Sequence, residues 1–120
     1  MKPLLAKDLA AFMQRFNNFK DGEFRSLEVI SPTTMKITLA GQDEARVFNW
    51  ISLELEFNGV RDAKLLDSSK LHLVDMSDGV NLIDDEGVAF GLGNYDNISS
   101  IKNSSFYIIC RDIKYQEGNF

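Results

Sequence analysis

The spacing of apolar residues changes at Gly22, and this change most constrains how the chain can fold. Before Gly22 the apolar side chains recur about every 3.6 residues, which places them on one stripe of an amphipathic helix. That stripe consists of Leu5, Leu9, Phe12, Met13 and Phe16. Pro3 suits the first turn of such a helix, and the segment "NNFKDG" that ends at Gly22 suits its end. After Gly22 the period is two, which predicts strands.

Six segments after Gly22 carry this strand signal, in which apolar and polar residues alternate. They read "EFRSLEVI", "TMKITLAG", "RVFNWISLELEF", "LLDSSKLHLVDM", "VNLIDDEGVAFGLG" and "SSFYIICRDIKY". The fourth is the weakest, and the fifth reads as two strands around a turn. One helix followed by about seven strands predicts an α+β fold in a single domain, residues 1–120. We expect the N-terminal helix to pack on a curved, mainly antiparallel sheet.

The strongest strand signal is "RVFNWISLELEF". Its predicted core face carries Val47, Ile51, Leu53, Leu55 and Phe57. The opposite, polar face also carries Phe48 and Trp50, which admits two interpretations. Either a loop or the far edge of the sheet covers these rings, or they are exposed anchors of the kind that dominate protein interfaces.

The dipeptide Asn58-Gly59 ends this strand and favours a tight type I′ hairpin, because both residues tolerate a positive φ. A two-residue loop would pair Arg61 with Glu56, which is favourable. The same register would set an acidic residue against the apolar face. A bulge or a longer loop after Gly59 is therefore the alternative.

The negative charge of the chain is concentrated in one region. Residues 1–70 contain ten acidic and ten basic residues, whereas residues 71–101 contain six acidic residues and no Lys or Arg. Residues 102–120 add three basic and two acidic residues, so the net charge is 0 − 6 + 1 = −5. Such a field repels nucleic acid and attracts basic surfaces. The residues expected to contact a basic protein partner are Asp75, Asp78, Asp84, Asp85, Glu86, Tyr95, Trp50 and Glu54.

Few residues suit catalysis or metal binding. His72 is the only histidine and Cys110 the only cysteine, so a zinc site lacks ligands. Cys110 lies in the apolar run "YIICR" and is expected to be a buried, inert thiol. Ser68 and Ser69 precede His72, but the glycines of a nucleophile elbow are missing. We expect no catalytic residue, no metal and no cofactor.

Two further motifs are incomplete. Asp84 and Asp85 are adjacent, so on an extended chain they point apart and suit a turn better than a glycosidase pair. The segment "GLGNYD" lacks the third glycine of a dinucleotide-binding loop.

The expected location is the cytoplasm. No stretch approaches the roughly 20 apolar residues of a membrane helix, so we expect no membrane partner. The N-terminal "MKPLLAKDLAAF" is interrupted by Lys7 and Asp8 before it reaches the length of a secretory signal. A single cysteine excludes an internal disulfide and suits a reducing compartment.

The helix-then-strands order, and "ISLELEFNGV" followed by an acidic region, resemble the α+β immunity proteins of bacterial toxin systems. This resemblance implies a non-catalytic protein that binds its cognate toxin stoichiometrically and occludes the active site, often that of a nuclease with a basic cleft. The resemblance assigns no binding residue.

Two other functions stay open at this point. The curved sheet could enclose a small apolar ligand, with Phe90, Phe106 and Trp50 lining the pocket. Scattered carboxylates could serve a low-activity hydrolase. An open sheet edge would also allow two copies to pair as a homodimer.

Overall fold

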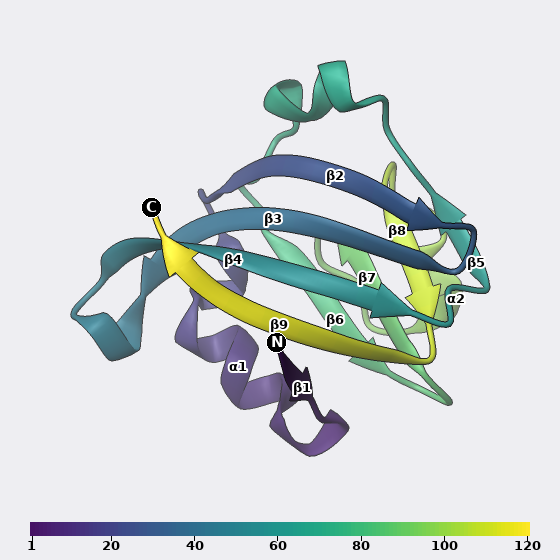
Figure 1. The fold of residues 1–120 in the computed structure, drawn as a ribbon, viewed down its shortest axis with the longest axis horizontal. Helices are drawn as coiled ribbons and strands as arrows, with labels where there is room; N and C mark the ends of the chain where they lie inside the picture. The colour runs from purple at the N-terminus through teal and green to yellow at the C-terminus, as the bar shows by residue number, and fades with distance from the viewer.

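The computed structural model describes residues 1–120 apart from the side chain of Ser68, so the Ser68–His72 pairing lies outside the described residues. Two antiparallel sheets lie face to face, with strand orders β1-β9-β4-β3-β2 and β5-β8-β7-β6 (Figure 1). The strands are β1 (Lys2–Leu4), β2 (Glu23–Ser31), β3 (Thr34–Asp43), β4 (Asn49–Asn58), β5 (Asp62–Lys64), β6 (Val80–Asp84), β7 (Val88–Leu92), β8 (Tyr107–Cys110) and β9 (Asp112–Asn119). The helices are α1 (Leu9–Arg15) and α2 (Ile98–Ile101), with 3-10 turns η1 (Ala6–Asp8), η2 (Asn17–Phe19), η3 (Glu44–Arg46) and η4 (Ser68–Leu73).

The predicted α+β class is confirmed, whereas the single curved sheet of about seven strands is wrong. The chain passes from one sheet to the other at two corners, Gly59 and Arg111. Gly59 has a φ of 67°, and a Cβ there would lie 2.8 Å from the Cβ of Arg111, so the two corners touch. The backbone N–H of Arg111 donates to the carbonyl oxygen of Asn58 at 3.0 Å. The predicted hairpin is therefore wrong, and Arg61 does not pair with Glu56, whose neighbours lie on β3 and β9.

The corner at Arg111 also divides the last strand signal into β8 and β9. Ile108 and Cys110 lie in the main core between the sheets, as their spacing predicts. Ile109 faces the outer side of the second sheet and packs in a smaller cluster. Strict alternation along "SSFYIICRDIKY" would place Ile113 on the face of Ile109, but Ile113 lies in the main core because the chain changes sheets between them.

Aromatic rings fill the space between the sheets. The Phe57 ring of β4 lies 5.4 Å from Phe90 of β7, and Phe106 lies 6.1 Å from Phe90. Every second residue from Ile51 to Phe57 is buried, which confirms the predicted core face of this strand. Each such side chain contributes roughly 2 kcal/mol of burial free energy. Because Phe90 and Phe106 are wholly buried and Trp50 lies on the outer face of β4, a pocket lined by these three is wrong.

The helix α1 covers the gap between β9 and β6 at one side of the two sheets (Figure 1). Its Phe12 ring lies 5.1 Å from the ring of Tyr115 on β9. The predicted apolar stripe is buried from Leu9 to Phe16, but Leu5 is exposed. Pro3 lies in β1 rather than in the first turn of the helix, because the N-terminal residues pair with β9.

Two short helical segments, α2 and η4, are not predicted by the spacing of apolar residues. α2 covers the outer side of the second sheet, where Ile101 packs on Gly91 so closely that an added Cβ would lie 2.2 Å from Ile101 Cγ1. A capping box between Asn97 and Ser100 begins this helix. Gly91 therefore provides room for a neighbouring side chain. The weakest predicted strand, "LLDSSKLHLVDM", is wrong, since it contains the 3-10 turn η4.

The edges of the sheets are short, covered or bulged. β1 and β5 have three residues each, and α1 contacts β6. β2 is longer, but its pairing with β3 shifts at Arg25 and again at Ile30. Because such features oppose edge-to-edge pairing, a homodimer through an edge stays a prediction without further support. Among the described residues, no helix is both long enough and apolar enough to cross a membrane.

Candidate functional site

The acidic residues predicted to contact a partner fall into two groups. Asp75 and Asp78 lie in the loop before β6, whereas Asp84, Asp85 and Glu86 lie at the β6–β7 turn, at the opposite end of that strand. All five side chains are exposed. None has a Lys or Arg nitrogen within 4.0 Å among the described side chains, so no ion pair cancels their charge.

The other three predicted contact residues lie in two places. Tyr95 is half-buried, packs with Ile101, and lines one hollow together with Asp75 and Asp78, so the structure brings these three predicted residues together. Trp50 and Glu54 lie on the outer face of β4 in the first sheet. The Glu54 carboxylate lies 4.0 Å from the ammonium group of Lys36. The structure therefore does not bring the eight residues into one surface.

A different feature stands out at the connection between β3 and β4, residues 44–48, here called the β3–β4 tip. Val47 has φ 56° and ψ 42°, and Phe48 has φ 63°. Two consecutive non-glycine residues in the left-handed region are uncommon, and a β-branched residue there is an outlier that costs about 1–2 kcal/mol. The Phe48 N–H donates to the Asp43 carbonyl oxygen at 2.9 Å and closes the connection.

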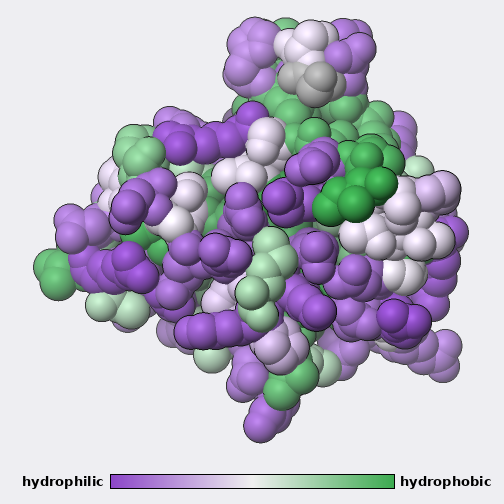
Figure 2. Space-filling model, in the orientation of Figure 1, coloured by the Kyte–Doolittle hydropathy of each residue, from purple (hydrophilic) through white to green (hydrophobic). Residues whose placement is uncertain are grey.

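The strained backbone of the β3–β4 tip turns apolar side chains toward solvent. Val47 is 85% exposed and Phe48 60% exposed, while Trp50 on the adjoining strand is 37% exposed. The Trp50 ring lies 5.4 Å from the ring of Phe120, which is also exposed. Figure 2 shows an apolar group projecting at the left end of the molecule, where the β3–β4 connection lies in Figure 1.

These exposures bear on the two interpretations of Phe48 and Trp50. Phe48 is exposed, and Trp50 is exposed in part beside Phe120. The role of the two rings as anchors of an interface stays a prediction. The prediction that Val47 faces the core is wrong. β4 begins only at Asn49, and the left-handed turn before it breaks the alternation on which that prediction depended.

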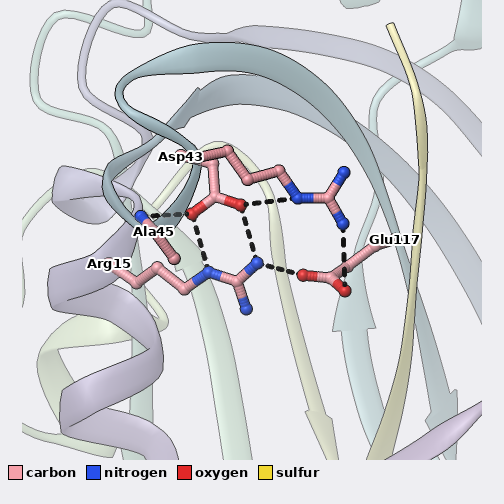
Figure 3. A network of polar contacts seen from close by, with 5 residues as sticks. Arg15, Asp43, Ala45 and Glu117 are labelled. Atoms are coloured by element: carbon pink, nitrogen blue, oxygen red, sulfur yellow. Dashed lines mark hydrogen bonds and ion pairs between the residues drawn. The ribbon is translucent and has the colours of Figure 1, made fainter.

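An ion network beneath the β3–β4 tip holds this conformation (Figure 3). The wholly buried carboxylate of Asp43 accepts two bonds from the Arg15 guanidinium, at 2.7 and 2.6 Å from Nε and Nη2. It also accepts from the backbone N–H of Ala45 at 2.9 Å and lies 3.3 Å from Nε of Arg46. Glu117 on β9 pairs with both arginines. The network thus connects α1, the end of β3, the β3–β4 tip and β9.

The network sets the charge states of its members. Hydrogen bonding to Arg15 holds the pKa of the Asp43 carboxyl below its ordinary value, so the carboxylate is ionised at neutral pH. Hydrogen bonding to Asp43 raises the pKa of Arg15 in turn. Two guanidinium groups and two carboxylates cancel in formal charge. An ionised, hydrogen-bonded Asp43 is suited to fixing a backbone and unsuited to donating a proton.

A hollow of about 490 Å³ lies beside the β3–β4 tip. Phe48 and Trp50 line one part of it, and Asp21, Glu44 and Lys20 supply charged groups. The backbone of Asp21 also connects the hollow to the first acidic group, because its N–H donates to the carbonyl oxygen of Met76 at 2.8 Å. Met76 follows Asp75 directly, but Asp75 and Asp78 line a different hollow.

Two further candidates for chemistry are the Cys110 thiol and a metal site. Burial raises the pKa of the Cys110 thiol to about 12, so the nucleophilic thiolate is scarcely populated at neutral pH. The residues that the structure describes hold no group of three or more His, Cys, Asp or Glu side chains arranged to bind a metal ion.

Sequence reasoning missed the network and the shape of the β3–β4 tip. The only available signal was the cluster of charges in "GQDEARVF" between two strands, which also reads as an ordinary polar loop. Comparison of the chain with protein-family models, with curated proteins and with solved structures returned no match. The proposals below therefore depend on the geometry of the β3–β4 tip, the network and the hollow.

Proposed function

We propose that this protein is a non-catalytic binding protein that neutralises a basic protein partner in the cytoplasm, as the immunity proteins of bacterial toxin systems do. We further propose that the β3–β4 tip is its main contact surface. The observation that carries this proposal is the exposure of Val47 and Phe48 on a strained backbone that an ion network holds in place. Strain of this kind persists where the surrounding structure fixes it, and it clusters at functional sites.

The geometry favours binding for an energetic reason. Exposed apolar side chains are costly in water and gain free energy when a partner covers them. A side chain on a fixed backbone loses little conformational entropy on binding, so more of its burial free energy appears as affinity. The β3–β4 tip combines both properties, with Trp50 and Phe120 extending the apolar surface behind Phe48.

The uncancelled carboxylates support a basic partner. A net charge of −5 steers positively charged proteins toward this chain at low ionic strength. Asp75 and Asp78 line a second hollow together with Tyr95 and would contact the partner there. The second group, Asp84, Asp85 and Glu86, would contribute to the long-range field. Acidic residues thus have two proposed roles, which can be separated by mutation.

Capture of the partner tests the proposal. Immobilised protein is exposed to a lysate of the organism that encodes it, and the affinity and activity of each captured protein are then measured. We expect a basic partner that is inhibited on binding in a 1:1 complex. Val47→Ser with Phe48→Ser should weaken binding by about 30-fold or more, as loss of a dominant contact does.

A control uses two exposed apolar residues on another element. Val29 and Ile30 on β2 are 53% and 50% exposed, so Val29→Ser with Ile30→Ser removes exposed apolar surface away from the β3–β4 tip. The control should retain the affinity of the wild type. Equal loss in both double variants would count against the β3–β4 tip, and captured partners that are not basic would count against the neutralising function.

A further inference from the structure

We propose that the hollow beside the β3–β4 tip holds an arginine or lysine side chain of the basic partner, between the rings of Phe48 and Trp50 and the carboxylates of Asp21 and Glu44. This inference rests on the proposed function and names the chemical group that the site recognises. It is carried by three observations, namely the charge of the lining, the aromatic walls and the size of the hollow.

The lining of the hollow is net negative once the ion network is taken into account. Arg15 lines the hollow, but its charge is cancelled within the network of two arginines and two carboxylates. Lys20, Asp21 and Glu44 remain, with a sum of −1. Among the described residues, neither Asp21 nor Glu44 has a Lys or Arg nitrogen within 4.0 Å. A cation that enters the hollow would therefore meet carboxylates that are free to pair with it.

Aromatic rings give the hollow a second attraction for a cation. The faces of Trp and Phe attract guanidinium and ammonium groups, and this attraction grows when water is excluded. The chain already shows this chemistry next to the hollow, where the guanidinium of Arg25 lies 4.2 Å from the centre of the Phe120 ring. Phe120 in turn contacts Trp50. An incoming arginine would continue the same pattern on rings that the chain leaves exposed.

The hollow is large enough to admit a side chain. Its volume of about 490 Å³ lies within the range of small-ligand pockets, roughly 300–1,000 Å³. The hollow lies between the β3–β4 tip and the segment after α1, and the network fixes the first relative to α1. The site is thus preformed, and entry of a side chain does not require the hairpin to move.

Trp50 provides a direct measurement, because it is the only tryptophan in the chain. Its fluorescence is recorded while the full-length protein is titrated with N-acetyl-arginine amide, and in parallel with N-acetyl-citrulline amide, a neutral molecule of nearly the same shape. We expect a saturable change with the arginine compound at a Kd on the order of 1 mM. The citrulline compound should bind about tenfold more weakly or not at all.

Three variants locate the effect. Asp21→Asn with Glu44→Gln should weaken binding of the arginine compound by about tenfold. Asp84→Asn with Asp85→Asn removes the same charge from the β6–β7 turn and should leave binding unchanged within about twofold. Lys20→Gln removes the repelling cation of the lining and should strengthen binding about threefold. An increase of this kind is not expected of a side chain with a purely structural role.

Several results would overturn the inference. An unchanged Trp50 emission with the arginine compound would do so, as would an equal response to both compounds, which would indicate a site for neutral ligands. Equal weakening by the two acidic double variants would show general attraction instead of a site. Affinity for the captured partner distinguishes failure of this inference from failure of the proposed function. If the Val47→Ser and Phe48→Ser protein loses the partner while the Asp21→Asn and Glu44→Gln protein keeps full affinity, the tip is supported and the hollow is refuted.

Discussion

The β3–β4 tip and the β6–β7 turn both reverse the chain with non-glycine residues at positive φ, but they present opposite kinds of side chain. The φ angles are 56° and 63° at Val47 and Phe48, and 52° at Glu86. The buried carboxylate of Asp43 lies beneath the β3–β4 tip, and the tip itself exposes apolar groups. The β6–β7 turn exposes three carboxylates, and its backbone is held by the Asp85 N–H, which donates to the Gly87 carbonyl oxygen at 3.0 Å.

The comparison separates two uses of charge in one protein. Beneath the β3–β4 tip, two guanidinium groups and two carboxylates bind each other and fix the backbone, so their charges are not available to a partner. Of the charged groups in the tip itself, only Glu44 stays unpaired among the described residues. At the β6–β7 turn, the charges are solvated and contribute to the external field. Counting acidic residues along the sequence therefore emphasises the turn, whereas burial and hydrogen bonding emphasise the tip. The following predictions test whether the two regions differ in this way.

The largest difference is expected when one carboxylate is neutralised in each region. Asp43→Asn leaves Arg15 and Arg46 without their buried partner and should lower the free energy of unfolding by about 3 kcal/mol. Removal of one partner from a buried ion pair costs about 3–5 kcal/mol. The lower value applies here because the side chains of Arg15 and Glu117 are 26% and 23% exposed. Asp85→Asn should change it by less than about 0.5 kcal/mol, since an exposed side chain loses only solvated charge. Urea denaturation at pH 7 measures both, and similar losses would contradict the distinction.

The pH dependence of stability should follow the buried carboxylate. The folded pKa of Asp43 is depressed, so its stabilising contribution is complete above the unfolded value near pH 4 and is lost as the pH falls through the folded value. The free energy of unfolding of the wild type should therefore decrease on acidification below about pH 4. Asp43→Asn should reduce the slope of that decrease. Denaturation series from pH 7 to pH 2.5 give the two slopes, and equal slopes would show that Asp43 is not the group responsible.

The smallest expected effect is the gain in stability when backbone strain is relieved at one residue in each region. Val47→Gly removes the penalty of a β-branched residue in the left-handed region and loses little packing, so a net gain of about 0.5–1 kcal/mol is expected. Glu86→Gly should gain less, about 0.3 kcal/mol, because an unbranched residue tolerates this region better. Thermal and urea unfolding of both variants provide the measurement. A loss of stability in Val47→Gly would mean that the side chain contributes packing beyond what its exposure indicates.

The period of the apolar residues was sufficient to predict most of the elements. It identified the buried stripe of α1 from Leu9 to Phe16 and the core face of β4 from Ile51 to Phe57, because burial of one face imposes its period on the sequence. It failed for η4 and α2, which have too few residues to show a period. It also failed at Val47, where a left-handed turn interrupts the alternation.

What the sequence by itself determined is the α+β class, the faces of the long elements, the inert character of Cys110 and the acidic balance of residues 71–101. Each of these depends on composition or on neighbours along the chain. The tertiary structure alone decided that there are two sheets, that the acidic candidates separate, and that Asp43, Arg15 and Glu117 meet. These results depend on contacts between residues far apart in sequence, such as Arg15 and Glu117, whose sequence separation is 102. Local periodicity carries no information about which distant side chains will share one buried site.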